Sequence, residues 1–283
     1  MFTIGRLKIS RALLTTSACV MLVATVSSAA LTDEQVAKKL ASIHLKEVLL
    51  NRMVTNICMI DAKIEVERNR ESVYKARDEF EKSITLIKKD VAALDQDNSA
   101  VKSLTRQLEK GQERWFRMRV FMDREMKEHA PSDSVLGEIA LMETGIEKVI
   151  DRSYKLLKRE ASRGGKLTLG EAIQETRQFE RVMLAEKMVK EACLVAMKEG
   201  GQMERALLHE ATMHFEKELE LDETSPLAPV AVKALVKDWR AIIPRVRALA
   251  SGEDADETLL VELEELKRNW FEASGVSLLS PTS

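Results

Sequence analysis

The chain has 283 residues, of which 45% are hydrophobic, 32% are charged and only 4% are aromatic, a composition typical of helix-rich globular proteins. The 44 Lys and Arg residues nearly balance the 46 Asp and Glu residues, so the chain lacks the basic footprint of a nucleic-acid-binding protein. The length allows one or two domains with a sizeable core.

The first thirty residues have the pattern of a signal peptide. Its three parts are basic residues at Arg6, Lys8 and Arg11, an apolar run at 12–26, and small residues at 27–30. The apolar run is short for a bilayer span, which needs about 20 residues. We therefore predict cleavage after Ala30 and export to the periplasm, with an uncleaved membrane anchor as the alternative.

Residues 42–86 are followed by a second copy 135 positions later, with no gap across 45 positions. The identical pairs include Met53/Met188, Cys58/Cys193, Lys63/Lys198, Arg70/Arg205 and Phe80/Phe215. A match of this length in one register predicts a duplicated helical module.

Apolar residues at three- and four-residue spacing predict helices along the whole mature chain. The expected ranges are 33–66, 68–95, 98–129 and 133–162 in the first copy, and 168–199, 201–221, 227–249 and 254–274 in the second. Gly164 and Gly165 divide the copies, since glycine commonly ends a helix. Four helices with short connections are typical of an antiparallel four-helix bundle.

We therefore predict an all-α fold of two tandem antiparallel four-helix bundle modules related by internal duplication. The expected segments are a signal peptide at 1–30, a first helical-bundle repeat at 31–163, a second at 164–275 and a loose tail at 276–283.

The first helix has apolar residues on two sides. At about 100° per residue, Leu45, Arg52 and Asn56 share a stripe that we expect to face the core of their own bundle. Val54 and Cys58 lie on the other side. A helix that is apolar on both sides is expected to have a second packing partner.

Three short segments of the first copy resemble a known sensor domain. They are Asn51-Arg52-Met53-Val54-Thr55-Asn56, Arg68-Asn69-Arg70 and Phe80-Glu81-Lys82. With a tryptophan downstream, they are similar to the PilJ-like domain, the periplasmic input domain of type IV pili methyl-accepting chemotaxis transducers, which is related to nitrate/nitrite sensor input domains. The resemblance implies a small anionic ligand and an envelope protein as signalling partner. It leaves open whether the chain forms a homodimer.

In the sensor family, arginines of the first-helix motif hold the anion where two subunits meet. Arg52 matches the first of these arginines, whereas Ile57 stands in the position of the second. Lys187 is the counterpart of Arg52 in the second copy. The resemblance thus implies a ligand-binding site at Arg52, Asn56 and Lys187. The alternative is that the two side chains extend along apolar surface to place their charges in solvent, or pair with carboxylates of the chain itself.

Cys58 and Cys193 are the two cysteines that remain after the predicted processing, and they are equivalent in the repeat. An oxidising compartment permits a disulfide between them, and two separate buried thiols are the alternative. Arg52 and Cys58 lie about 120° apart on a helix, so a two-fold axis through the cysteines cannot also bring Arg52 against Lys187.

The sequence contains no constellation that predicts catalysis, a metal or a cofactor. His209 and His214 are five residues apart on an expected helix, whereas two histidines that share one zinc ion need a spacing of four. We therefore expect a protein that is not an enzyme. The leading hypothesis is an exported sensor-type protein that binds a small ligand and signals to a partner. The alternative is a structural scaffold for an envelope assembly such as a type IV pilus or secretion system.

Overall fold

The computed structural model describes residues 33–92, 97, 99–127, 133–163, 169–198, 201–226, 228–255 and 258–276. These residues form eight α-helices and no strand, which confirms the predicted all-α class. The predicted signal peptide lies outside them. In this part of the chain, no helix combines the length and the apolar sequence that a membrane span requires.

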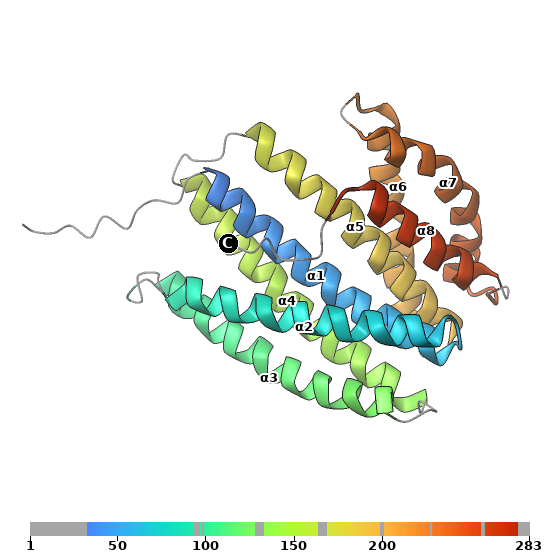
Figure 1. The fold of residues 1–283 in the computed structure, drawn as a ribbon, viewed down its shortest axis with the longest axis horizontal. Coiled ribbons are helices and arrows are strands. Elements are labelled where there is room, and N and C mark those ends of the chain that lie inside the picture. The colour runs from blue at the N-terminus through green and yellow to red at the C-terminus, as the bar shows by residue number, and fades with distance from the viewer. Residues whose placement is uncertain are drawn as a thin grey trace, which may run out of the picture. The chain divides into compact units, whose positions relative to one another are not determined.

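The helices overlap the eight predicted ranges. They are α1 Asp33–Asp61, α2 Val66–Ala92, α3 Ser99–Lys127, α4 Asp133–Arg163, α5 Leu169–Ala196, α6 Gln202–Thr224, α7 Val230–Ser251 and α8 Leu259–Ala273 (Figure 1). The largest differences are that α1 ends five residues before the predicted 66 and that α8 begins five residues after the predicted 254.

A left-handed backbone residue ends α1 early. Lys63 has a φ of 62°, and its N–H donates to the carbonyl oxygen of Ile60 at 3.0 Å. The end of α5 is built in the same way, because Lys198 has a φ of 60° and its N–H donates to the carbonyl oxygen of Val195 at 3.1 Å. Such a residue satisfies the last carbonyl groups of a helix and turns the chain away from it.

Helices α1 and α5 lie side by side and connect the other helices (Figure 1). On the side of the first half, α1 packs against α2 and α4, and α3 packs mainly against α4. In the second half, α5 packs against α6 and α8, and α7 contacts both α6 and α8. We call the contact between α1 and α5, with the parts of α4 and α8 beside it, the seam.

Burial along α1 follows from this central position. From Leu49 to Met59, every residue except Arg52 is at most 2% exposed. The second partner that the two apolar sides of α1 predict is therefore α5.

One aromatic pair recurs in each half. The rings of Phe80 and Trp115 lie 4.6 Å apart between their centroids, and those of Phe215 and Trp239 lie 4.8 Å apart. In the second half, Trp270 of α8 joins the pair, with its ring 5.5 Å from that of Phe215. Aromatic contacts of this kind add stabilisation beyond the area that they bury.

The last described residue is part of the packed structure. Val276 is buried against Val48 of α1 and Val182 of α5. The expected loose tail therefore cannot include Val276, and the rest of that tail, 277–283, lies outside the described residues.

Candidate functional site

Every site residue that the sequence singled out lies on α1 or α5. Arg52, Asn56 and Cys58 lie on α1, and Lys187 and Cys193 lie on α5. The two helices run in the same direction, because contacts between them join earlier residues with earlier ones and later residues with later ones.

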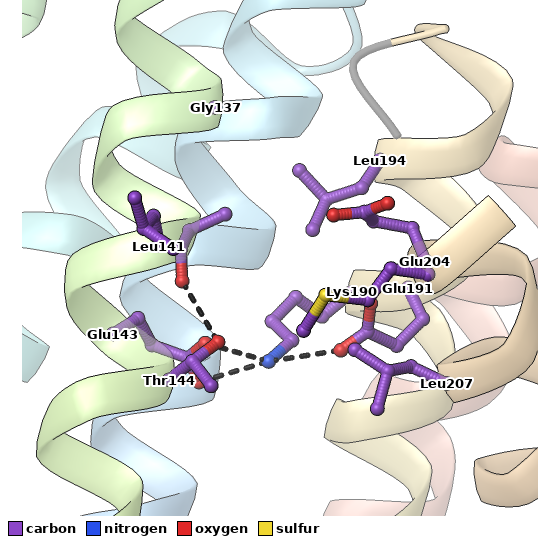
Figure 2. Close-up of a pocket in the computed structure, with 11 residues that line it drawn as sticks. Gly137, Leu141, Glu143, Thr144, Lys190, Glu191, Leu194, Glu204 and Leu207 are labelled. Atoms are coloured by element: carbon purple, nitrogen blue, oxygen red, sulfur yellow. Dashed lines mark hydrogen bonds and ion pairs between the residues drawn. The ribbon is translucent and has the colours of Figure 1, made fainter. Parts of the chain in front are cut away.

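A buried lysine joins α5 to α4. The Nζ atom of Lys190 lies 2.8 and 2.9 Å from the two carboxylate oxygens of Glu143 (Figure 2). A carboxylate oxygen of Glu191 lies 3.1 Å from the same nitrogen, and one of Glu147 lies 3.9 Å away. Asn51 of α1 donates to Glu147 at 2.9 Å, so this Lys190 cluster connects three helices. The arrangement satisfies the requirement that a buried charge be paired.

The Lys190 cluster holds more carboxyl groups than ammonium groups. Burial acts to lower the pKa of Lys190, but the surrounding carboxylates outweigh it and raise that pKa. Burial raises the pKa of Glu143 well above its ordinary value, and the nearby Glu147 adds to the effect. Burial likewise raises the pKa of Glu47, on α1, to about 7. Such a site disfavours a further negative charge, so it is not suited to an anion.

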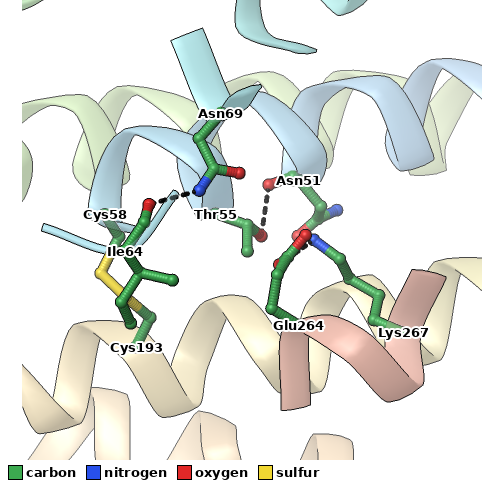
Figure 3. The surroundings of a disulfide bond; sticks show 8 residues. All are labelled: Asn51, Thr55, Cys58, Ile64, Asn69, Cys193, Glu264 and Lys267. Carbon is green, nitrogen blue, oxygen red and sulfur yellow. Dashed lines mark hydrogen bonds and ion pairs between the residues drawn. A yellow bond between two sulfur atoms is a disulfide. The ribbon is translucent and has the colours of Figure 1, made fainter. Parts of the chain in front are cut away.

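One helical turn beyond Lys190 on α5, Cys193 forms a disulfide with Cys58 of α1 (Figure 3). Their Cα atoms are 6.2 Å apart, and both side chains are fully buried. The bond ties the C-terminal ends of α1 and α5 together across 135 residues of sequence. Of the two arrangements that the sequence left open for these cysteines, the structure has the bonded one.

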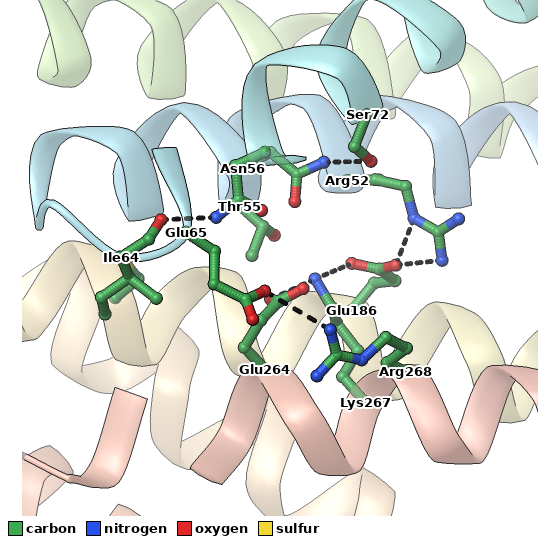
Figure 4. Close-up of polar contacts among 12 residues, drawn as sticks. Arg52, Thr55, Asn56, Ile64, Glu65, Ser72, Glu186, Glu264, Lys267 and Arg268 are labelled. Carbon is green, nitrogen blue, oxygen red and sulfur yellow. Dashed lines mark hydrogen bonds and ion pairs between the residues drawn. The ribbon is translucent and has the colours of Figure 1, made fainter. Parts of the chain in front are cut away.

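Arg52 is bound by a carboxylate from the second half of the chain. Its Nε and Nη2 atoms both lie 2.6 Å from one carboxylate oxygen of Glu186, on α5 (Figure 4). The other carboxylate oxygen of Glu186 lies 3.3 Å from the Nζ atom of Lys267, on α8. The guanidinium carbon also lies 4.3 Å from the ring centroid of Phe271, within the range of a cation–π contact.

Glu186 is completely buried, yet it is negatively charged. Burial acts to raise the pKa of Glu186, but Arg52 and Lys267 outweigh it and hold that pKa below its ordinary value. The charge of Arg52 is therefore compensated inside the protein. The expectation that Arg52 faces the core of its own bundle is wrong, because its contacts are with α5 and α8.

The other two predicted ligand residues have different surroundings. The amide nitrogen of Asn56 donates to the hydroxyl of Ser72, on α2, at 2.6 Å, and the Asn56 side chain is buried. Lys187 lies close enough to Glu47 and Glu147 for its positive charge to favour a lower pKa of each carboxyl. Arg52, Asn56 and Lys187 therefore interact with three separate sets of groups.

Among the residues that the structure describes, no group of three or more His, Cys, Asp or Glu side chains is arranged to hold a metal ion. Comparison of the chain with protein-family models, with curated proteins and with solved structures found no match. The functional interpretation therefore depends on the contacts of this chain itself.

Several charged residues of the seam had no place in the sequence-based interpretation, among them Glu143, Glu186, Lys190 and Lys267. A signal was present for Lys190, which together with Glu191 interrupts an otherwise apolar stretch from Met188 to Val195. Charged residues in such positions are rarely buried unless they are paired. The partners could not be predicted, because they come from helices far away in the sequence.

Proposed function

We propose that the protein is a non-catalytic interaction protein of the periplasm, a scaffold within an envelope assembly rather than a receptor for a small anion. The proposal includes export through the predicted signal peptide. It also includes the two tandem four-helix bundle modules, residues 31–163 and 164–275, which arose by duplication.

Equivalent local structures support the duplication. Lys63 and Lys198 end their helices with the same conformation and the same hydrogen bond. The Phe80–Trp115 contact has its counterpart in Phe215–Trp239. Lys63 and Lys198, and Phe80 and Phe215, correspond in the sequence repeat, so their agreement in structure is a further argument for it.

The contact between Arg52 and Glu186 carries the functional proposal. In the family that this chain resembles, the anion binds where the first helices of two subunits meet. Here α1 and α5 of one chain meet in parallel, and the Glu186 carboxylate lies against the Arg52 guanidinium. The chain therefore supplies the negative group itself, which leaves this arginine compensated without an external anion.

Two further features favour a fixed scaffold. The disulfide joins the ends of α1 and α5, and the Lys190 cluster joins α5 to α4 through buried ion pairs. Breaking a buried ion pair costs about 3–5 kcal/mol, so a sliding motion along this seam would be expensive. A sensor needs an element with two accessible conformations, whereas a scaffold can function with a single conformation.

A sensor that binds a small ligand and signals to a partner is the second candidate, and one cavity favours it. The cavity has a volume of about 330 Å³ near the C-terminal end of α5. Its charged lining residues are Lys198, Arg205, Glu253 and Asp254. Two positive and two negative groups suit a small zwitterion better than a nitrate-like anion.

A thermal-shift comparison tests the proposal. We expect nitrate and nitrite to leave the melting temperature of the mature protein unchanged relative to chloride at the same ionic strength. In Glu186→Gln, Arg52 loses its compensating charge, so nitrate should stabilise this variant although it does not stabilise the wild type.

A saturable shift in the wild type that disappears in Arg52→Gln would contradict the scaffold proposal. A ligand at 100 times its Kd should raise the free energy of unfolding by about 2.7 kcal/mol. A shift by an amino acid or another zwitterion that disappears in Arg205→Gln, but not in Arg52→Gln, would favour the second candidate.

A further inference from the structure

A groove lies between α4, α5 and α6, and residues of all three helices line it (Figure 2). Its cavity has a volume of about 80 Å³. Leu141 of α4 is 69% exposed and Met203 of α6 is 56% exposed, and both line the cavity. Leu194 and Leu207 extend the apolar lining. We call these four residues, with Glu204, the α4–α6 groove. Two exposed apolar side chains beside a cavity give a partner apolar area to bury.

The surroundings of the α4–α6 groove are acidic. Glu204 lines the groove, and so do Glu143 and Glu191 of the Lys190 cluster, which has a surplus of carboxyl groups. Helix α6 as a whole has seven Asp and Glu residues against two Lys and Arg residues. A partner surface that fits here should combine apolar side chains with positive charge.

Helix α3 carries a surface of that kind. Phe116 and Val120 lie one turn apart and are 58% and 53% exposed. The helix has eight Lys and Arg residues against four Asp and Glu residues, the opposite balance to that of α6. Arg119 lies over the Phe116 ring at 5.6 Å, and Arg117 is exposed beside it. We call Phe116, Arg117 and Val120 the α3 face.

We propose that the α3 face of one copy of this protein docks in the α4–α6 groove of a second copy. Phe116 and Val120 would cover Leu141 and Met203, and Arg117 would approach Glu204. In the single chain, Arg117 pairs with Glu113 at 2.7 Å, but both side chains are exposed. Exposed pairs contribute little, so Arg117 can exchange this partner at small cost.

The occupant is a second copy because one chain carries both surfaces, with opposite charge and matching apolar residues. The contact joins different surfaces, so two copies either hold it twice in a closed dimer or continue into longer assemblies. This inference rests on the proposed scaffold function and names one partner for it. The two fail separately, because an anion-induced shift contradicts the scaffold and a monomer contradicts the docking.

Analytical ultracentrifugation of the oxidised mature chain tests the docking. We expect association that increases with protein concentration and weakens as sodium chloride is added, because salt screens contacts between charged surfaces. Arg117→Glu and Glu204→Arg should each raise the dissociation constant by about tenfold or more, because each places like charges in contact.

Mixing the two variants gives the decisive comparison. Each contact in the mixed pair again joins opposite charges, so the mixture should associate within about threefold of the wild type although each variant alone does not. Phe116→Ser and Met203→Ser should also weaken association. Because both positions are exposed, the variants should fold normally, which circular dichroism verifies. Lys237→Glu, an exposed substitution on α7, is the charge-matched control and should have no effect.

A wild type that stays monomeric at every concentration would overturn the proposal. Association that is insensitive to salt, or a mixture no stronger than the separate variants, would do the same. Photo-crosslinking from position 203 in cells that yields a different protein in place of a second copy would overturn it as well.

Discussion

Lys63 and Lys198 share one backbone conformation at the ends of two helices that lie side by side. Their φ angles are 62° and 60°, and each N–H donates to the carbonyl oxygen three residues earlier. This conformation costs an L-residue roughly 1–2 kcal/mol, which is why glycine is the usual residue at such a helix end. The chain accepts this cost twice, at equivalent positions of the sequence repeat.

Replacing either lysine by glycine should therefore stabilise the protein. We expect Lys63→Gly and Lys198→Gly each to raise the free energy of unfolding by about 0.5–1 kcal/mol, because the strain disappears while glycine adds some entropy to the unfolded chain. Urea denaturation measures this change. Lys75→Gly, at an exposed position inside α2, is the control and should destabilise by about 1 kcal/mol. Two lysine variants that behave like this control would disprove the account of the helix ends.

The sequence predicted the helices better than their ends. Periodicity predicts all eight helices, but it also predicts that α1 continues to residue 66, because Ile64 and Val66 are apolar and no glycine marks the turn at Lys63. The turn depends on backbone hydrogen bonds that the composition does not reveal. For α8, the acidic stretch before Leu259 resembled a first helical turn, and its residues at 254 and 255 lie before the helix.

The site was predicted in part for a similar reason. The repeat suggested a disulfide between Cys58 and Cys193 because the two cysteines occupy equivalent positions in the two copies. The same equivalence says nothing about Arg52 and Glu186, since Glu186 corresponds to Asn51 in the first copy. Contacts between non-equivalent positions depend on how the helices cross, which a repeat alone does not determine.

Removal of the disulfide should lower stability strongly. On the chain-entropy relation, closing a loop of this length contributes about 4–5 kcal/mol, and measured values are often smaller. We expect Cys58→Ala/Cys193→Ala to lose about 2–5 kcal/mol in urea denaturation. Without reductant, the denatured wild-type protein that begins after Ala30, and therefore lacks Cys19, should contain no free thiol by reaction with a thiol reagent. Two free thiols would show that the bond does not form.

Lys190 should be far more important for stability than an exposed lysine. Lys190→Met leaves Glu143 and Glu191 buried without their positive partner, which should cost about 3–5 kcal/mol. Lys155→Met is the matched control, because Lys155 pairs with Asp151 at 2.8 Å on the surface, where such pairs contribute about 0–1 kcal/mol. Equal losses in chemical denaturation of the two variants would contradict the assignment of Lys190 as the centre of the cluster.

Stability should also depend on the protonation of Glu47. Burial, with help from Glu147 and Asp151, raises the pKa of Glu47 from 4.5 to about 7 against the opposing effect of Lys187 and Lys190. The folded protein thus binds this proton more tightly than the unfolded chain does. The contribution of Glu47 to the unfolding free energy is therefore fully present below pH 4.5 and is lost as the pH rises to about 7.

Glu47→Gln removes this pH dependence. Between pH 4.5 and 7, the unfolding free energy of the wild type minus that of the variant should fall by about 2–3 kcal/mol, since one pKa unit corresponds to about 1.4 kcal/mol. Urea titrations at a series of pH values provide the measurement. A difference that stays constant, or one that grows with pH, would refute the raised pKa.

The parallel pairing of α1 and α5 within one chain frees the two helices from having identical sequences. In a homodimer, every substitution changes both subunits at once, so a glutamate introduced beside one arginine also appears at the corresponding position of the other subunit. Once both helices belong to one polypeptide, Asn51 and Glu186 can differ, and so can Thr55 and Lys190. On the proposed duplication, the Arg52–Glu186 pair at one flank and the Lys190 cluster at the other are divergences that only a fused ancestor could accumulate.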